Sequence, residues 1–197
     1  AVADCTGHGV PGALMSMIGT SLLNQIVIEK QIHTPGLILQ HLHVGIRRAL
    51  RQDEGEASSQ DGMDIGIIRI EADRQRVTFA GAKRPLYLAD STGSFQEIQG
   101  DRKPIGGRQK EAVRHFTEHQ VEIQDEMTFY LCTDGLADQP GDIESKFGTR
   151  RVRELLQANC QLSLDEHHTR IIAAIAAHQG QTPQRDDMAL VGVRIRI

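Results

Sequence analysis

The first seventeen residues constrain the fold and the chemistry of this chain more than any other stretch. A short apolar run ends in Asp4, a glycine-rich turn follows, and a helix is predicted with Pro11 in its first turn, where the missing N–H costs nothing. An acid at a strand end, beside glycines that let a ligand approach the backbone, suits a hard cation or a phosphate. The plainer alternative is an Asp that only caps a helix. A P-loop is excluded, because no Gly-Lys-Ser/Thr closes the turn.

Three further acids stand at the edges of two strand-like runs. Asp134 follows the apolar run 127–132, and Asp186 and Asp187 precede the run 188–193. Acids that are far apart in sequence but end strands in this way can converge at one end of a sheet. Carboxylates without a cluster of Cys and His favour Mn²⁺ or Mg²⁺ and argue against zinc.

The hydrophobic periodicity predicts an α+β protein. The first helix should bury Leu14, Ile18, Leu22 and Ile26, and His43 and His167 are expected on solvated helix faces. Helices are expected at 10–30, 34–51, 149–159 and 163–178, an acidic loop at 135–143, and strands at 63–71, 76–81, 85–89, 94–98, 112–119, 120–123, 127–132 and 188–197, with the strands from 63 to 98 forming an antiparallel meander.

Composition limits the classes of partner. A chain of 197 residues suits a single domain, and a net charge of −4 with mixed signs gives no reason to expect nucleic acid or an anionic membrane. Three cysteines cannot all pair within one chain, so a reducing cytosol is the simplest setting. We expect no apolar run as long as the roughly 18 residues of a membrane span.

Three motifs, in this order, resemble one enzyme family. Asp4-Cys-Thr-Gly-His-Gly9, Thr133-Asp-Gly135 and Arg185-Asp-Asp-Met188 resemble the metal-dependent type 2C (PPM) Ser/Thr protein phosphatases in their bacterial SpoIIE-like branch. The segments 61–67, 80–87 and 134–139 look like its sensor-linked members. The resemblance implies two antiparallel sheets packed as a sandwich, with helix pairs outside and metals at one end between the sheets. It also implies that residues 1–197 are a single phosphatase domain truncated at its N-terminus, because strands precede this point in the family.

The resemblance assigns roles to four residues. Asp4 matches the carboxylate that bridges two metals, and the carbonyl of Cys5 matches the next ligand. Asp134 and Asp186 match the remaining ligands of the first metal. The implied cofactors are Mn²⁺ or Mg²⁺, with two ions in the complete domain.

Other site residues are less firmly assigned. Asp187 matches a position often filled by Asn, Asp64 could support the site or hold an extra metal, and His8 could be catalytic or pack the loop. The phosphate-binding Arg of eukaryotic members has no match here. Lys83 or Arg84 could replace it, or could belong to an ordinary solvated hairpin.

The implied function is hydrolysis of phosphoserine or phosphothreonine on a small regulatory protein in bacterial signalling. The alternative is a non-catalytic module that binds a phosphorylated partner; the three retained acids favour the enzyme. The resemblance further implies an upstream sensor or linker domain in the same polypeptide, and a cytoplasmic domain whose parent is compatible with an inner-membrane anchor. A homodimer remains open, and the chain beginning at Ala1 is expected to be a poor phosphatase.

Overall fold

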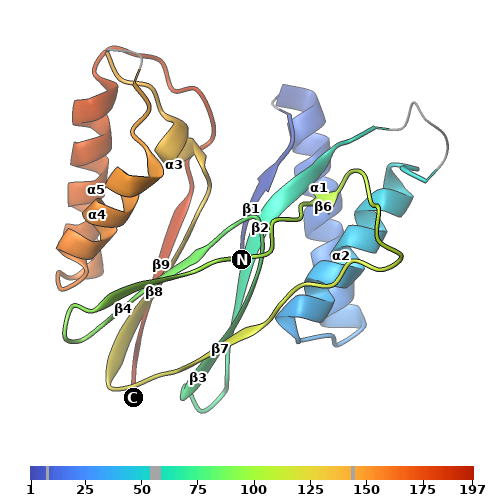
Figure 1. Ribbon diagram of the computed structural model, residues 1–197, viewed down its shortest axis with the longest axis horizontal. Helices are drawn as coiled ribbons and strands as arrows, with labels where there is room; N and C mark the ends of the chain where they lie inside the picture. The colour runs from blue at the N-terminus through green and yellow to red at the C-terminus, as the bar shows by residue number, and fades with distance from the viewer. Residues whose placement is uncertain (8, 54–58, 143–144) are drawn as a thin grey trace. The chain divides into compact units, whose positions relative to one another are not determined.

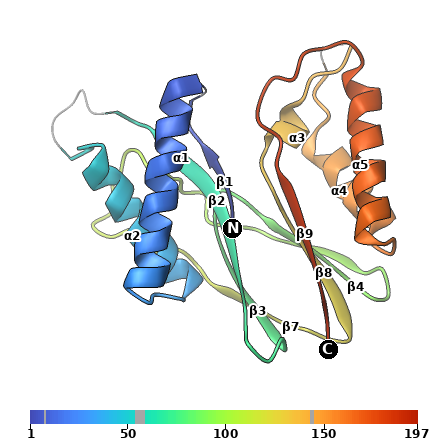
Figure 2. The same cartoon turned by 180° about the vertical axis from the view of Figure 1, so that it is seen from behind.

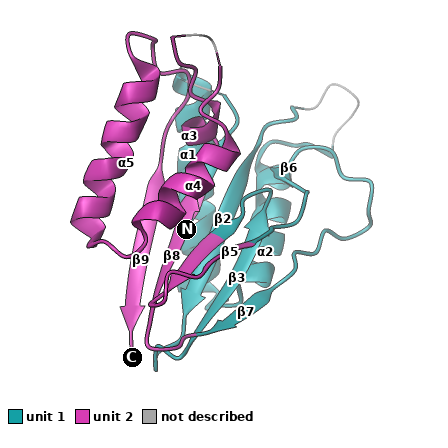
Figure 3. Ribbon diagram, turned by 60° about the vertical axis from the view of Figure 1, so that its left-hand side comes forward, with its two compact units in different colours: residues 1, 3–86, 98–122 teal, residues 2, 87–97, 123–197 magenta. Residues whose placement is uncertain are grey.

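The computed structural model describes residues 1–7, 9–53, 59–142 and 145–197. The chain forms two compact units, which are coloured separately in Figure 3. Unit 1 comprises Ala1, Ala3–Leu86 and Ile98–Glu122, and unit 2 comprises Val2, Tyr87–Glu97 and Ile123–Ile197. The strands are β1 (Val2–Cys5), β2 (Gly62–Ile70), β3 (Arg76–Ala82), β4 (Leu86–Asp90), β5 (Phe95–Ile98), β6 (Ile105–Gly106), β7 (His119–Glu122), β8 (Glu126–Cys132) and β9 (Leu190–Arg196), and the helices are α1 (Gly9–Asn24), η1 (Gln25–Glu29), α2 (Pro35–Ala49), α3 (Gly135–Asp138), α4 (Thr149–Asn159) and α5 (Leu164–Gln179).

Unit 1 is a sheet with a helix pair on it. The strand order is β1-β2-β3-β7, and β6 adds to β2. Strands β2 and β3 pair antiparallel from Gly66↔Gly81 to Ile70↔Val77. Helices α1 and α2 lie side by side (Figures 1 and 2), and α2 begins, as predicted, with Thr34 as N-cap and Pro35 in the first turn. The core of the unit joins α2 to the sheet through Leu39, Leu42, Ile46, Met63, Ile65 and Ile105.

The predicted buried face of the first helix is confirmed for Ile18, Leu22 and Ile26, which lie in or against the core, but not for Leu14. Met15 is 4% exposed and packs in the core, whereas Leu14 is 54% exposed. A Cβ on Gly19 would lie 2.6 Å from the methyl carbon of Met63, so the small residue lets the helix approach the sheet there. The amphipathic pattern of α1 is weak near its start, so close packing at Gly19 decides which side chains are buried there.

Together α1 and η1 form one continuous helix, Gly9–Glu29. It is long and apolar enough to cross a membrane by length and composition, with a mean hydropathy of 1.3. The expectation of no such run is therefore wrong. The same helix contributes Met15 and Ile26 to the core of unit 1, as the core helix of a folded domain would.

Unit 2 is a second sheet with a helix pair, in the order β5-β4-β8-β9. Strands β8 and β9 pair antiparallel from Glu126↔Arg196 to Cys132↔Leu190. The predicted helices α4 and α5 are present, and α5 begins with a capping box in which Ser163 and Glu166 bond reciprocally. The core contains Tyr87, Tyr130, Val152, Leu156, Ile171 and Ile175.

Several local predictions are wrong. The predicted strand 112–119 has no regular structure before His119, and the meander 63–98 divides between the two sheets because β4 pairs with β8. The predicted acidic loop begins with the helical turn α3. His43 and His167 are each 1% exposed, not on solvated faces; His167 lies 3.2 Å from the hydroxyl of Tyr130.

Candidate metal centre

The first group of acids lies in unit 1, where Asp4 and Asp64 face the same guanidinium. Asp4 is on β1 and Asp64 is on the neighbouring strand β2. Nη2 of Arg84 lies 3.1 Å from Oδ2 of Asp4 and 3.3 Å from Oδ2 of Asp64. All three side chains are largely buried, and Nζ of Lys83 adds a longer contact of 3.6 Å to Asp64. The acid pair is therefore built around a positive charge.

The turn that follows Asp4 is attached to the start of β2 by Thr6. The backbone N–H of Thr6 donates to the carbonyl of Gly62 at 3.0 Å, and the N–H of Gly62 donates back to the Thr6 hydroxyl at 2.9 Å. Gly12 is needed here, because a Cβ on it would lie 2.6 Å from the carbonyl oxygen of Gly7. The glycine-rich turn thus packs tightly between the end of β1 and the start of α1.

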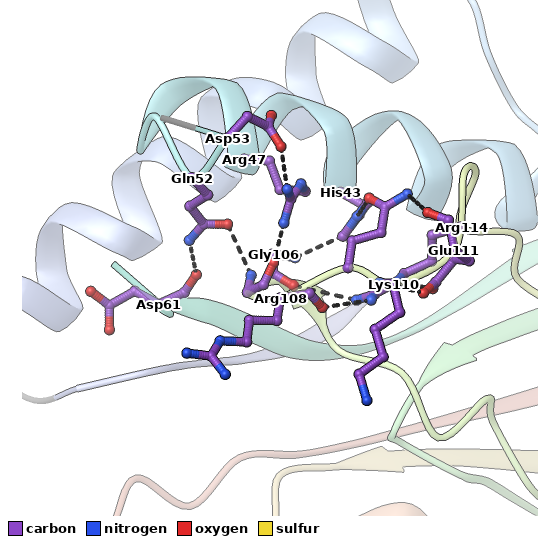
Figure 4. Close-up of polar contacts among 12 residues, drawn as sticks. His43, Arg47, Gln52, Asp53, Asp61, Gly106, Arg108, Lys110, Glu111 and Arg114 are labelled. Atoms are coloured by element: carbon purple, nitrogen blue, oxygen red, sulfur yellow. Dashed lines mark hydrogen bonds and ion pairs between the residues drawn. The ribbon is translucent and has the colours of Figure 1, made fainter. Parts of the chain in front are cut away.

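The start of β2 is also supported by a polar network centred on His43 (Figure 4). Gly106 pairs with Gly62 in the sheet and donates its N–H to Nδ1 of His43 at 3.0 Å. Because Nδ1 accepts this bond, Nε2 carries the proton and donates to Oε1 of Gln109 at 2.8 Å. Burial lowers the pKa of His43, the Gln109 bond raises it, and the nearby Arg114 and Arg47 lower it further. The imidazole is thus held neutral.

Arg114 fixes the other side of the same loop. Its guanidinium donates to the carbonyls of Pro104 and Arg108, each at 2.8 Å, and its Nε donates to Glu111 at 2.7 Å. The bond from Arg114 lowers the pKa of Glu111 to about 2. On the opposite side, Gln52 bridges the carbonyl of Asp61 and the N–H of Gly107 (Figure 4). Sequence reasoning missed these residues, since bonds to backbone groups leave no spacing pattern.

The second group of acids lies in unit 2, where β8 ends. Thr133 ties this end to the segment before β9: its hydroxyl donates to the carbonyl of Asp187 at 2.9 Å and accepts from the N–H of Ala189 at 2.9 Å. A Cβ on Gly135 would lie only 2.3 Å from the carbonyl oxygen of Asp187. Thr133-Asp-Gly135 is therefore a packing motif that brings the backbone of Asp134 beside that of Asp186 and Asp187. All three acids have exposed side chains.

Gln139 holds the chain that leads into this second group. It is 1% exposed; its amide nitrogen donates to the carbonyl of Pro183 at 3.2 Å, and its amide oxygen accepts from the N–H of Arg185 at 3.3 Å. The Thr133 hydroxyl and the Gln139 side-chain amide therefore hold the segment that contains Asp186 from both of its ends. The sequence motif 134–139 includes Gln139, but the motif does not reveal that Gln139 holds the chain before Asp186.

The donors present in each of the two units suit a hard cation. In both units these donors are carboxylates, and Asp4 and Asp64 already accommodate a positive charge. Across the described residues, no three His, Cys, Asp or Glu side chains are grouped to hold a metal ion.

Cys5 follows Asp4 on β1, and burial raises the pKa of its thiol. His8 lies outside the described residues.

Comparison with known proteins identifies the family. The model of the family "Stage II sporulation protein E (SpoIIE)" matches residues 1–196. The SiaA-PP2C domain of Pseudomonas aeruginosa is similar at 33% identity and a TM-score of 0.84, over 98% of this chain and 74% of that one. The chain belongs to the SpoIIE family of PP2C-type phosphatase domains, which are metal-dependent Ser/Thr phosphatases. The resemblance inferred from the motifs is thereby confirmed. No curated protein matches.

More distant structures show the fold. The phosphatase domain of SpoIIE from Bacillus subtilis, solved with a fragment of its regulatory domain, has 16% identity and a TM-score of 0.68, over 98% of this chain and 53% of that one. The catalytic domain of the phosphatase PstP, in complex with two manganese ions, has 18% identity and a TM-score of 0.64, over 98% and 84%. The predicted α+β class with two antiparallel sheets is confirmed.

Proposed function

We propose that this chain hydrolyses phosphoserine or phosphothreonine on a small regulatory protein, with Mn²⁺ or Mg²⁺ as cofactor. The observation that carries the proposal is the position of the acids within a SpoIIE-family fold. Asp4 is the next-to-last residue of β1, Asp134 follows the end of β8 by two residues, and Thr133 and Gly135 hold the backbone of Asp186 and Asp187 beside Asp134. Carboxylates near strand ends are suitable ligands for hard divalent cations.

The cation ligands that we propose are Asp4 and the carbonyl of Cys5 in unit 1, and Asp134 and Asp186 in unit 2. Asp64 and Asp187 support them from the neighbouring positions. Divalent cations in such a site activate a water molecule and neutralise phosphoryl oxygens. Thr6 and Gly12 keep the Asp4 turn close to α1 and β2, so the carboxylate is already oriented before a ligand arrives.

The regulatory context is part of the proposal. The SpoIIE structure includes a fragment of a regulatory domain, which supports an upstream sensor or linker in the same polypeptide as this chain. We place the phosphatase domain in the cytoplasm of a bacterium, with its phosphoprotein substrate. Fractionation of cells would test whether the parent protein is in the membrane or the soluble fraction.

The function is tested by turnover of p-nitrophenyl phosphate and of a phosphoprotein, with and without Mn²⁺. Asp134→Asn or Asp186→Asn should lower turnover at least about a hundredfold while the fold is kept, because each removes a ligand charge. The matched control is Asp138→Asn, in the same segment, where the carboxylate makes only an exposed ion pair of 3.0 Å with Lys146. Binding of a phosphoprotein without any metal-dependent turnover would establish the non-catalytic module instead.

A further inference from the structure

Arg84 occupies the space that the carboxylates of Asp4 and Asp64 share. Its side chain is 9% exposed, and those of Asp4 and Asp64 are 18% and 20% exposed. We propose that Arg84 is a built-in counter-ion that competes with a divalent cation for Asp4, and so sets the metal affinity of the site. The inference rests on the proposed function, since it takes Asp4 to be a metal ligand.

The backbone conformation around Arg84 directs its side chain toward Asp4 and Asp64. Lys83, in the short connection 83–85 between β3 and β4, adopts a left-handed conformation with φ of 59°. A Cβ on Gly81 or Gly100 would lie 2.2 or 2.5 Å from the carbonyl oxygen of Arg84. The carbonyl of Asp101 holds this connection, because it accepts from the N–H of Lys83 at 2.7 Å. These contacts therefore fix the backbone position from which Arg84 reaches β1 and β2.

Burial makes the positive charge necessary. Two carboxylates that are largely removed from water repel each other and lose solvation unless a cation compensates them. A guanidinium can contact two carboxylates at once through its planar set of donors. Lys83 cannot take its place, because its side chain is 48% exposed and its contact with Asp64 is 3.6 Å long.

The same contact opposes metal binding. A divalent cation that binds Asp4 must share the carboxylate with a guanidinium 3.1 Å away, or displace it. Like charges at such short range repel strongly in a partly buried site. Arg84 should therefore stabilise the protein without metal while weakening the affinity for the cation, so its removal should change the two quantities in opposite directions.

The test is Arg84→Gln in the full chain, with Mn²⁺ binding measured by calorimetry and melting measured in chelator and in Mn²⁺. We expect the Kd for Mn²⁺ to fall about tenfold, because a competing positive charge is lost. The melting temperature in chelator should fall, and the rise produced by Mn²⁺ should be larger than in the parent chain. These readouts do not require turnover.

Two variants make the result specific. Arg84→Lys keeps the charge, so its Kd should stay within about threefold of the parent value, and it remains informative if Arg84→Gln does not fold in chelator. Arg76→Gln is the matched control, because Arg76 is at the start of β3, the strand before Arg84, and makes an exposed ion pair with Glu122; it should leave the Kd unchanged.

The measurements distinguish a failure of the counter-ion role of Arg84 from a failure of the proposed metal-dependent function. Unchanged or weaker Mn²⁺ binding in Arg84→Gln, with normal binding by the parent chain, would overturn the counter-ion role alone and show that Arg84 preorganises the acids or only packs. An affinity gain in Arg84→Lys as large as in Arg84→Gln would also overturn it. If the parent chain binds no Mn²⁺ at millimolar concentration, the metal-dependent function itself fails.

Discussion

Replacing Gly135 by alanine tests whether the strand end at Asp134 and the segment at Asp186 form one site. The added Cβ would lie 2.3 Å from the carbonyl oxygen of Asp187 and 2.9 Å from its carbonyl carbon. An unstrained contact needs more than 3 Å, so the two segments must separate by about 1 Å. The bonds of Thr133 to Asp187 and Ala189, both 2.9 Å, would then stretch beyond hydrogen-bonding distance.

The size of the effect follows from this displacement. Overpacking of this kind costs about 1–3 kcal/mol of folding free energy. A shift of about 1 Å in a catalytic group lowers turnover on the order of a hundredfold, and a disturbed ligand shell lowers metal affinity about tenfold or more. We therefore expect Gly135→Ala to fold, to melt at a lower temperature, and to lose metal-dependent turnover far beyond its loss of stability.

The assay combines urea unfolding, Mn²⁺ calorimetry and turnover of p-nitrophenyl phosphate at saturating Mn²⁺. Gly192→Ala is the control, because a Cβ there would meet side chains rather than backbone, the ring of Tyr130 at 3.3 Å and Cδ2 of Leu164 at 3.6 Å; it should change stability slightly and turnover not at all. A destabilised Gly135→Ala that keeps full turnover and Mn²⁺ affinity would refute the reasoning, because Asp186 could then not belong to the centre.

Three further variants test the supporting structure. The pKa of His43 is lower in the folded chain than in the unfolded one, so as the pH falls the unfolded chain binds a proton at a higher pH than the folded chain. Stability should therefore fall as the pH drops below about 6.5. His43→Gln should reduce this loss of stability, measured by urea unfolding at pH 7.5 and 5.5. The reduction should be partial, because the pKa of His167 is also lowered. The exposed His41→Gln should leave the loss unchanged; identical losses in the parent chain and both variants would contradict the prediction. Arg114→Met leaves the carbonyls of Pro104 and Arg108 without their donor and should cost at least about 3 kcal/mol by chemical denaturation; a loss under 1 kcal/mol would show that water replaces the guanidinium. Ser163→Ala removes the capping box of α5 and should cost about 1 kcal/mol in thermal melts, and no loss would mean that the cap contributes nothing.

The elements that sequence predicted well are those whose signals are local. Helix α5 starts at Ser163 because Ser and Glu166 form a capping box, and α2 starts beside Thr34 because Pro35 fits a first turn. Strand β8 ends at Cys132, and the acid after it was recognisable because an apolar run stops there. Such patterns depend on neighbours within a few residues, so one sequence is enough to recognise them.

The features that sequence did not predict depend on partners far along the chain. In α1, Met15 rather than Leu14 is buried where Gly19 approaches Met63, and β4 pairs with β8 instead of continuing the predicted meander. His43 is expected on the surface because it lies two residues from His41 and cannot share a helix face with it as a ligand pair, but its ring nitrogens bond Gly106 and Gln109, more than sixty residues away. A single sequence contains no record of such pairings.

Arg84 shows why the acids of the site were easier to find than the residue between them. Asp4 and Asp64 stand at ordinary strand positions, but the cation that joins them comes from a turn eighty residues after Asp4 and twenty after Asp64. Whether Arg84 is solvated or buried depends on the left-handed Lys83 and on the approach of Gly100 to the turn. Neither is written in the local sequence Ala-Lys-Arg-Pro, which equally suits an exposed hairpin. The backbone geometry therefore decides that the guanidinium of Arg84 lies between Asp4 and Asp64. The spacing of the two acids in the sequence does not identify Arg84 as their counter-ion.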